Sequence, residues 1–274
     1  MEPLIAVKNL NIAFLQQGVE THVVKDISFD VCPQEVLAIV GESGSGKSVT
    51  ALSIMRLLPP PPYCTLRGEI TYGQLDVLKL TEKQLRKIRG AGVAYIFQEP
   101  STSFNPVFTI GYQIAEAIRL HLADVDDVKA YAIQLLRKVG LEGQHYEAYP
   151  HMLSGGMQQR AMIAMALACH PRVLIADEPT TALDVTIQKQ IIELLKNLQR
   201  TENLTIVLIT HNFGIVRHFA QRVLVMFQGK IVEKGLSEQI VTHPRHPYTQ
   251  ALIACIPTIG QRKERLQIID YSAF

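Results

Sequence analysis

The most constraining feature of the sequence is a glycine-rich stretch, GESGSGKS, at residues 41–48. It follows five apolar residues at 36–40, a run typical of a strand buried on both faces. After it, apolar residues recur with helical spacing until the prolines at 59–62. A strand, a glycine-rich turn and a helix in this order match G-x-x-x-x-G-K-[ST], a loop whose backbone N–H groups surround phosphates. We therefore expect an α/β core that binds a nucleotide.

The residues of this loop have separate predicted roles. Its glycines let the backbone wrap around phosphate groups, Lys47 is expected to neutralise β- and γ-phosphate charge, and Ser48 to ligate Mg²⁺. A chance glycine-rich turn is the alternative. The predicted nucleotide contacts are Gly41, Glu42, Ser43, Gly44, Ser45, Gly46, Lys47, Ser48 and Val49.

An acidic pair, Asp177 and Glu178, ends a second apolar run at 173–176. Ligands of open α/β sheets bind at the carboxyl ends of the strands, so these carboxylates are expected near the phosphates. Asp177 suits the Mg²⁺ shell, usually through water, and Glu178 suits a general base for the attacking water. The alternative is an ordinary helix-capping pair.

Two further polar residues follow predicted strands. His211 comes after the apolar run 205–209, where a hydrogen bond to the γ-phosphate is plausible, although a lone histidine is more often structural. Gln98 follows a short apolar stretch at 95–97, and its amide can join the Mg²⁺ shell. Read alone, Gln98 is a loop residue, and only the order of the motifs makes it a candidate.

A second phosphate-binding pattern, LSGGMQQR, lies at 153–160. Ser154, Gly155 and Gly156 stand just before an apolar helical run, an arrangement that builds an anion-binding helix start. One nucleotide-binding domain does not need two such sites for a single triphosphate, and this duplication requires an explanation.

The rest of the chain organises around these motifs. We expect one domain over 1–274, with an α/β core and β-subdomain at 1–89 and 169–235, a helical insertion at 90–168 and a tail at 236–274. A helix is predicted between the acids at 126–127 and Gly140, another over 187–198, and a hairpin over 222–233.

Composition excludes several functional classes. Lys and Arg number 27 against 25 Asp and Glu, which does not suggest a nucleic-acid-binding polycation. The longest apolar run, 161–169, is half of a membrane span, and no signal peptide is evident, so we expect a cytosolic protein that can sit on a membrane partner. Four scattered cysteines, Cys32, Cys64, Cys169 and Cys255, favour buried or half-buried thiols over disulfides or metal ligands.

These motifs occur in one order, from the loop at 41–48 through Gln98, the 153–160 signature, the acidic pair and Asp184 to His211. This order resembles the ATP-binding cassette ATPases of ABC transporters over almost the whole chain. The resemblance implies an α/β P-loop cassette with a mixed sheet, an N-terminal antiparallel β-subdomain and an inserted helical subdomain. It also implies ATP and Mg²⁺ as cofactors.

The resemblance explains the second phosphate pattern. In that family two cassettes pack head to tail, so Ser154, Gly155 and Gly156 would contact the nucleotide held by the partner. Asp184 matches the D-loop aspartate that sets the geometry between the two sites. Phe14 resembles the aromatic residue that stacks on adenine, and a core phenylalanine on an edge strand is an almost equal alternative.

Closer details resemble the oligopeptide, dipeptide and nickel importer branch: PSTSFNPVFTIGYQI at 100–114, ADEPTTALDVT at 176–186 and HPRHPYTQAL at 243–252. Met157 resembles the first of that branch's two ATPase subunits. The implied function is ATP hydrolysis that powers import of oligo- or dipeptides, with nickel or another small solute as the alternative. A non-transport cytosolic cassette ATPase, a small-molecule P-loop kinase and a catalytically inactive partner are rival interpretations.

The implied partners are a second, related ATPase subunit in a heterodimer or a homodimer, membrane permease subunits and, indirectly, an extracytoplasmic solute-binding protein. No nucleic acid is expected. The implied location is the cytoplasmic face of the inner membrane, as a peripheral subunit.

The sequence departs from the family pattern in two places. Asn212 stands where Asp commonly follows the histidine, and the cysteine-bearing tail of many peptide importers is not seen, so we expect no iron–sulfur cluster. His243 and His246 have H-x-x-H spacing, but Pro244 and Pro247 break any helix that would align both imidazoles, so we expect no metal there.

Overall fold

A computed structural model of the chain describes residues 2–181 and 183–255. The chain divides into two compact units, Met1–Leu78 with Leu208–Phe274, and Lys79–Val207. Each unit is described separately below. Strand β8 (Thr205–Ile209), buried along its whole length, carries the chain across the division.

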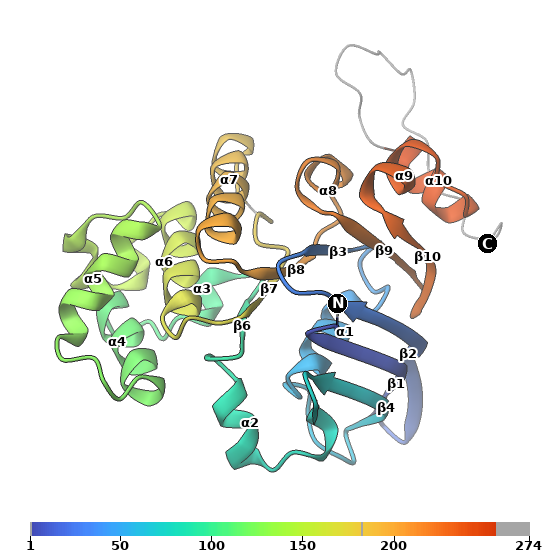
Figure 1. Cartoon of the computed structure of the whole chain (residues 1–274), viewed down its shortest axis with the longest axis horizontal. Helices are drawn as coiled ribbons and strands as arrows, with labels where there is room; N and C mark the ends of the chain where they lie inside the picture. The colour runs from blue at the N-terminus through green and yellow to red at the C-terminus, as the bar shows by residue number, and fades with distance from the viewer. Residues whose placement is uncertain (1, 182, 256–274) are drawn as a thin grey trace. The chain divides into compact units, whose positions relative to one another are not determined.

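The first unit contains most of the strands (Figure 1). Its helices are short and follow strands or turns. The elements are β1 (Ile5–Gln16), β2 (Val19–Val31), β3 (Val36–Val40), α1 (Lys47–Ile54), β4 (Cys64–Tyr72), β5 (Leu75–Asp76), α8 (Phe213–Phe219), β9 (Arg222–Phe227), β10 (Lys230–Leu236), α9 (Ser237–Thr242) and α10 (Pro247–Ala254). A 3-10 turn, η1 (Val77–Lys79), leads out of it.

An antiparallel sheet with the order β2-β1-β4-β5 forms one layer of this unit. Strands β1 and β2 are joined by a tight turn with Gly18 at a φ of 81°, and their register pairs Ile5 with Val31. The apolar residues that alternate along β1 are buried, as expected for a sheet with one face on a core. Contacts between β2 and β10 join this sheet to the second one.

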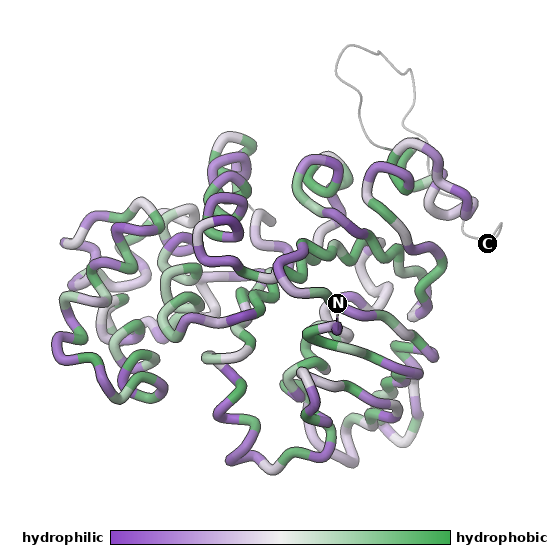
Figure 2. The backbone as a smooth tube through the Cα atoms, viewed as in Figure 1, coloured by the Kyte–Doolittle hydropathy of each residue, from purple (hydrophilic) through white to green (hydrophobic). Residues whose placement is uncertain are grey.

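The second sheet of this unit has the order β10-β9-β3. Strand β3 is fully buried and pairs in parallel with β9, while β9 and β10 form the antiparallel hairpin predicted over 222–233. The sheet is therefore mixed, as the fold class required. Apolar residues run along β3 and β9 in Figure 2, which agrees with a strand pair covered on both faces.

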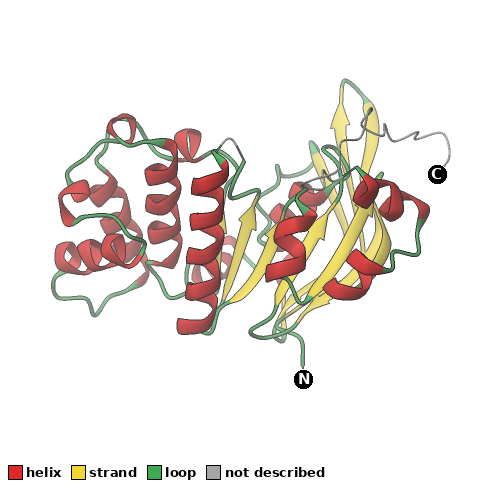
Figure 3. Cartoon of the chain, turned by 90° about the horizontal axis from the view of Figure 1, so that it is seen from above, coloured by secondary structure: helices red, strands yellow, loops and turns green. Residues whose placement is uncertain are grey.

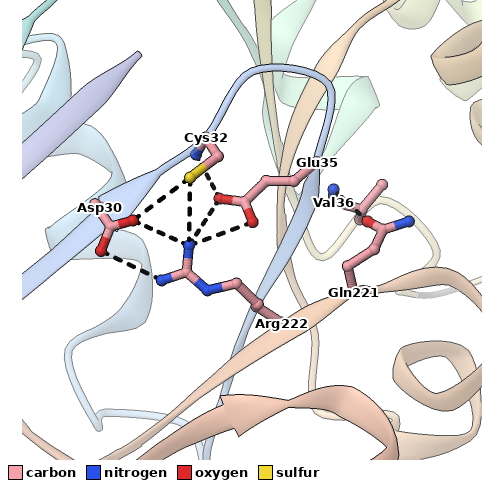
Figure 4. Close-up of polar contacts among 6 residues, drawn as sticks. All are labelled: Asp30, Cys32, Glu35, Val36, Gln221 and Arg222. Carbon is pink, nitrogen blue, oxygen red and sulfur yellow. Dashed lines mark hydrogen bonds and ion pairs between the residues drawn. The ribbon is translucent and has the colours of Figure 1, made fainter. Parts of the chain in front are cut away.

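A polar cluster ties the end of β2 to the start of β9 (Figure 4). The guanidinium of Arg222 donates two hydrogen bonds to Asp30, at 3.0 and 3.3 Å, and another to Glu35 at 3.2 Å. Beside it, Val36 and Gln221 exchange hydrogen bonds of 2.6 and 2.9 Å. A planar, bidentate cation between two carboxylates gives this joint a defined geometry.

The second unit is mainly helical. Its elements are α2 (Glu82–Ile88), β6 (Val93–Ile96), α3 (Pro100–Ser103), α4 (Ile110–His121), α5 (Val128–Lys138), η2 (Gly143–Tyr146), η3 (Pro150–Met152), α6 (Gly155–Leu167), β7 (Val173–Asp177) and α7 (Val185–Thr201). Strands β6 and β7 are parallel neighbours, with Tyr95 opposite Ile175.

Helices α4, α5 and α6 pack on one another and form a group without strands between them (Figure 3). The helix predicted after the acids at 126–127 is α5, and Asp127 caps it by accepting a hydrogen bond from the Ala130 N–H at 2.9 Å. Helix α7 carries both hydrophilic and hydrophobic residues along its length (Figure 2) and buries Ile191, Leu195 and Leu198, so the predicted amphipathic helix is present.

The four cysteines are free thiols, with Cys64 and Cys169 buried and Cys32 and Cys255 half-buried, as predicted. Burial raises the pKa of Cys169 to about 11, so this thiol stays protonated at neutral pH. Across residues 2–181 and 183–255 no group of His, Cys, Asp or Glu is arranged to hold a metal ion, and no helix combines the length and apolarity of a membrane span. The tail beyond Cys255 lies outside the described residues, so the expected lack of an iron–sulfur cluster stays a prediction.

Replacing Arg222 by alanine is expected to lower the free energy of unfolding by about 1.5–3 kcal/mol at neutral pH, because hydrogen bonds to charged groups are worth that much. Hydrogen bonds from Arg222 hold the pKa of Asp30 below its usual value of 3.8. A depressed folded-state pKa adds stability above the unfolded value, and this stability is lost as the pH falls through the folded value. The difference in the free energy of unfolding between the wild type and Arg222→Ala should therefore become smaller below about pH 4.

Urea unfolding monitored by circular dichroism at several pH values measures this difference. Arg217→Ala, on the exposed face of α8, is the matched control and should change stability little. An equal loss for both variants at pH 7 would contradict the role given to the cluster.

Candidate functional site

The loop between β3 and α1 can be built only with glycine at two positions. Gly41 has a φ of 150°, and a Cβ there would lie 2.2 Å from the Met226 carbonyl oxygen. Gly46, the N-cap of α1, has a φ of 101°, and its Cβ would lie 3.0 Å from the Val23 carbonyl oxygen. Both residues combine a left-handed backbone with close approach of another chain segment, so a side chain at either would distort the loop.

Polar groups inside the loop suit an anion. The ammonium of Lys47 is buried and donates to the Glu42 carbonyl at 2.6 Å, while the Ser45 N–H donates to the same oxygen at 3.2 Å. The hydroxyl of Ser45 is buried and has no hydrogen-bond partner among the described residues. A buried cation, a buried hydroxyl without a partner and the N–H groups at the start of α1 together fit a phosphate.

In the second unit, Asp177 closes β7 and is 5% exposed. The hydroxyl of Tyr95, on the neighbouring strand β6, donates to its carboxylate at 2.7 Å. Burial, and then the negative charge of Asp177, raise the pKa of Tyr95 well above its usual range, so Tyr95 stays protonated and donating. Sequence reasoning missed Tyr95, because a tyrosine in an apolar strand gives no signal of a polar contact.

Glu178 follows with a φ of 44°, a left-handed conformation that is uncommon for a residue other than glycine. Its carboxylate accepts a hydrogen bond from the Thr181 hydroxyl at 2.7 Å and one from the Gln98 amide at 3.3 Å. The structure therefore brings together two predicted residues, Gln98 and Glu178, that are 80 positions apart. Backbone strain held in place by side-chain hydrogen bonds is typical of functional sites.

The signature residues lie at the start of α6. Ser154 is the N-cap, and its hydroxyl accepts from the Met157 N–H at 3.4 Å. A Cβ on Gly156 would lie 2.7 Å from the Ile187 side chain, so this glycine also lets α6 pack against α7. Asp184 caps α7 by accepting from the Ile187 N–H at 3.0 Å, which places it at the start of the neighbouring helix.

Two predicted site residues of the first unit, His211 and Phe14, lie outside the loop. His211 is exposed and follows β8, and Asn212 caps α8 by accepting from the Gly214 N–H at 2.9 Å. The unusual Asn212 thus has a local structural function. Phe14 is half-buried on β1, which lies between β2 and β4, so the edge-strand alternative for Phe14 is wrong.

The predicted residues therefore form two sets. The loop, His211 and Phe14 belong to the first unit, whereas Gln98, the acidic pair, the signature and Asp184 belong to the second. Within the second unit, a hydrogen bond joins Gln98 to Glu178, and helix packing places the signature beside the start of α7. The contacts with Tyr95 and Thr181 are additions that sequence reasoning did not find.

Comparison with known proteins agrees with this geometry. Residues 24–181, more than half of the chain, match the family described as ABC transporter. Residues 232–272 match the family described as oligopeptide/dipeptide transporter, C-terminal region. The resemblance to the peptide-importer branch is thereby confirmed.

Two curated relatives are similar over nearly the whole chain. The glutathione import ATP-binding protein GsiA of Escherichia coli (strain K12) is 52% identical over 268 residues, which are 95% of this chain and 43% of the relative. The peptidoglycan transport ATP-binding protein YejF of Agrobacterium fabrum is 51% identical over 259 residues, 93% of this chain and 47% of the relative. The chain thus spans less than half the length of these relatives.

Solved structures show the same fold. A dimeric post-hydrolysis structure of the ATP-binding cassette MJ0796, bound to ADP and Pi, has a TM-score of 0.76 and 27% identity, and the match covers 85% of this chain and 98% of that one. The cbiO1 protein of Clostridium perfringens, part of the transporter complex cbiONQ, has a TM-score of 0.73 and 26% identity, with 89% and 92% covered. The predicted fold class is confirmed, and the chain belongs to the ABC transporter family.

Proposed function

We propose that this chain hydrolyses ATP and that the reaction drives import of peptides through membrane partners. The observation that carries the proposal is the loop at 41–48, where glycines that admit no side chain surround a buried lysine and a buried serine hydroxyl. Such a loop serves a phosphate ligand and has no evident structural purpose. Binding of ATP to the purified chain, and its loss in Lys47→Ala, test this first step.

In this proposal the loop holds the triphosphate. Residues 41–49 supply N–H groups, Lys47 exchanges its bond to the Glu42 carbonyl for the phosphates, and the Ser45 hydroxyl gains the partner that it lacks. Phe14, half-buried on β1, would stack on the adenine, and His211 would donate a hydrogen bond to the γ-phosphate. Positioning and charge neutralisation supply most of the rate in phosphoryl transfer.

A magnesium ion fits the donor set that the sequence predicts. Hydroxyl, carboxylate and amide oxygens are hard ligands, and Ser48, Asp177 and Gln98 would hold the ion directly or through water. The Tyr95 hydroxyl occupies one side of the Asp177 carboxylate and orients it. When bound, Mg²⁺ neutralises charge that develops on the phosphates.

Glu178 is the proposed general base. Thr181 and Gln98 both donate to the same carboxylate oxygen, Oε2, and these bonds would orient the carboxylate that accepts a proton from water in this scheme. In this scheme the Gln98 side chain would shift between Glu178 and the Mg²⁺ shell. Loss of the γ-phosphate would then move the segment that follows Gln98 in the chain. This segment includes exposed apolar side chains, Val107 and Phe108, through which the helical group could contact a membrane partner.

The signature acts in a second cassette under this proposal. Ser154, Gly155 and Gly156 would contact the nucleotide held by the partner's loop, and Asp184 would set the geometry between the two sites. The dimeric MJ0796 structure with ADP and Pi supports the idea of a paired cassette. We propose a heterodimer with a related ATPase subunit, with a homodimer as the second possibility.

The proposed cargo is a short peptide. The match of residues 232–272 to the oligopeptide/dipeptide region and the glutathione importer among the relatives support it. Membrane permease subunits and, indirectly, an extracytoplasmic binding protein complete the assembly, and the chain would lie peripherally on the cytoplasmic face of the inner membrane. Nickel or another small solute is the second candidate.

Glu178→Gln is expected to lower the rate of ATP hydrolysis at least about 100-fold while ATP is still bound, because a general base contributes about that much. Phosphate release by the assembled transporter and binding of radiolabelled ATP measure the two effects. Glu116→Gln, exposed on α4, is the matched control and should leave both unchanged. Normal hydrolysis by Glu178→Gln would show that another group takes the proton.

Ser154→Arg is expected to abolish hydrolysis but to leave ATP binding to the isolated chain within about twofold, because the signature serves the partner's nucleotide. Ser154→Thr keeps the hydroxyl and the helix cap and should retain activity. Hydrolysis at full rate by a strictly monomeric preparation of Ser154→Arg would rule out the shared site.

A further inference from the structure

Tyr248, in the C-terminal helix α10, reaches the phosphate loop. Its side chain is completely buried, and its hydroxyl oxygen accepts a hydrogen bond from the Glu42 N–H at 3.1 Å. The two residues are 206 positions apart. The ring of Tyr248 packs against Phe227, with centroids 4.2 Å apart, at the end of β9. A buried hydroxyl on a packed ring is a rigid acceptor, so the loop is hydrogen-bonded at this point to the C-terminal segment.

The start of α10 is itself held in place. The carboxylate of Glu233, on β10, accepts hydrogen bonds from the N–H groups of Arg245 and His246 at 2.8 and 3.0 Å. His246 is the N-cap of α10 and accepts from the Tyr248 N–H at 3.1 Å, and Pro247 occupies the first helical position. His246 and Pro247, two of the residues in the H-x-x-H stretch that could suggest a metal site, thus serve to place Tyr248.

The contact acts on Glu42, the residue whose carbonyl also binds Lys47. The Glu42 N–H bonds to Tyr248, and the Glu42 carbonyl accepts from Lys47. On the other side of the loop, the Gly229 N–H donates to the Ser45 carbonyl at 3.1 Å. The β9–β10 hairpin and α10 therefore fix the loop at two points, one on each side of Gly44, whose own surroundings are open.

We propose that Tyr248 is a positioning residue for nucleotide binding, through which the C-terminal segment sets the shape of the phosphate loop. The inference rests on the proposed function of that loop. Without the hydroxyl, the Glu42 N–H loses this partner, and this side of the loop must be ordered further when the phosphates bind. The free energy needed to order the loop would weaken the affinity for phosphate-bearing ligands, because a preorganised loop binds without this penalty.

Tyr248→Phe removes only the hydroxyl and keeps the ring against Phe227. We expect the variant to bind a non-hydrolysable ATP analogue with Mg²⁺ about three- to tenfold more weakly than the wild type, as for the loss of one hydrogen bond. ADP should show a similar decrease, whereas adenosine should bind equally to both proteins. The urea midpoint and the hydrolysis rate of the assembled transporter at saturating ATP should stay close to the wild type.

Tyr131→Phe is the matched control, because the Tyr131 hydroxyl bonds to the Ala168 carbonyl and to His170 in the second unit. It should not change affinity. Calorimetric titration of the full chain measures all three proteins, and hydrogen exchange at the Glu42 amide should be faster in Tyr248→Phe alone.

Two outcomes separate the inference from the proposal on which it rests. Equal affinities for Tyr248→Phe and the wild type, with binding lost in Lys47→Ala, would overturn the role of Tyr248 and leave the function intact. A wild-type chain that binds no ATP would instead refute the function. A uniform loss of affinity for ATP, ADP and adenosine would indicate general loosening of the fold and would also overturn the inference.

Discussion

The Met226 carbonyl oxygen lies where a side chain on Gly41 would have to be, and the phosphate loop depends on this constraint. Because β9 pairs in parallel with β3, the end of β9 lies against the residue that turns the chain out of β3. In the same way, the carbonyl oxygen of Val23, from the antiparallel sheet, lies close to where a side chain on Gly46 would be. The two sheets of the first unit thus shape the loop with backbone oxygens, and the position of Lys47 at the start of α1 follows from them.

Hydroxyl groups have a matching role in the second unit. Tyr95 holds Asp177 and Thr181 holds Glu178, each at 2.7 Å. A neutral donor orients a carboxylate without offsetting its charge, in contrast to Arg222, whose positive charge pairs with Asp30 and Glu35 at a structural joint. Carboxylates therefore have a cationic neighbour at the structural joint. They have neutral hydroxyl neighbours at the site where they are proposed to act on a charged ligand.

The elements built from local patterns were predictable. The buried runs at 36–40, 173–176 and 205–209 became β3, β7 and β8, and the acid-capped helix became α5. The residue types of the site were also predictable, because loops, strand ends and helix starts carry them in sequence order. Contacts between distant side chains were not, since neither the Tyr248 hydroxyl on Glu42 nor Gly156 against Ile187 leaves a periodic signal. The short helices α9 and α10 were also missed, and at α10 the reason is that His246 and Pro247 hid a helix start.

Glu178 sits at a backbone conformation that its own side chain does not favour. A left-handed residue other than glycine costs roughly 1–2 kcal/mol, and asparagine tolerates the conformation better. A chain selected only for thermal resistance would therefore drift away from glutamate at this position. With glutamate at this position, the chain carries this conformational cost in its folded state, and the proposed general base is the residue that imposes it.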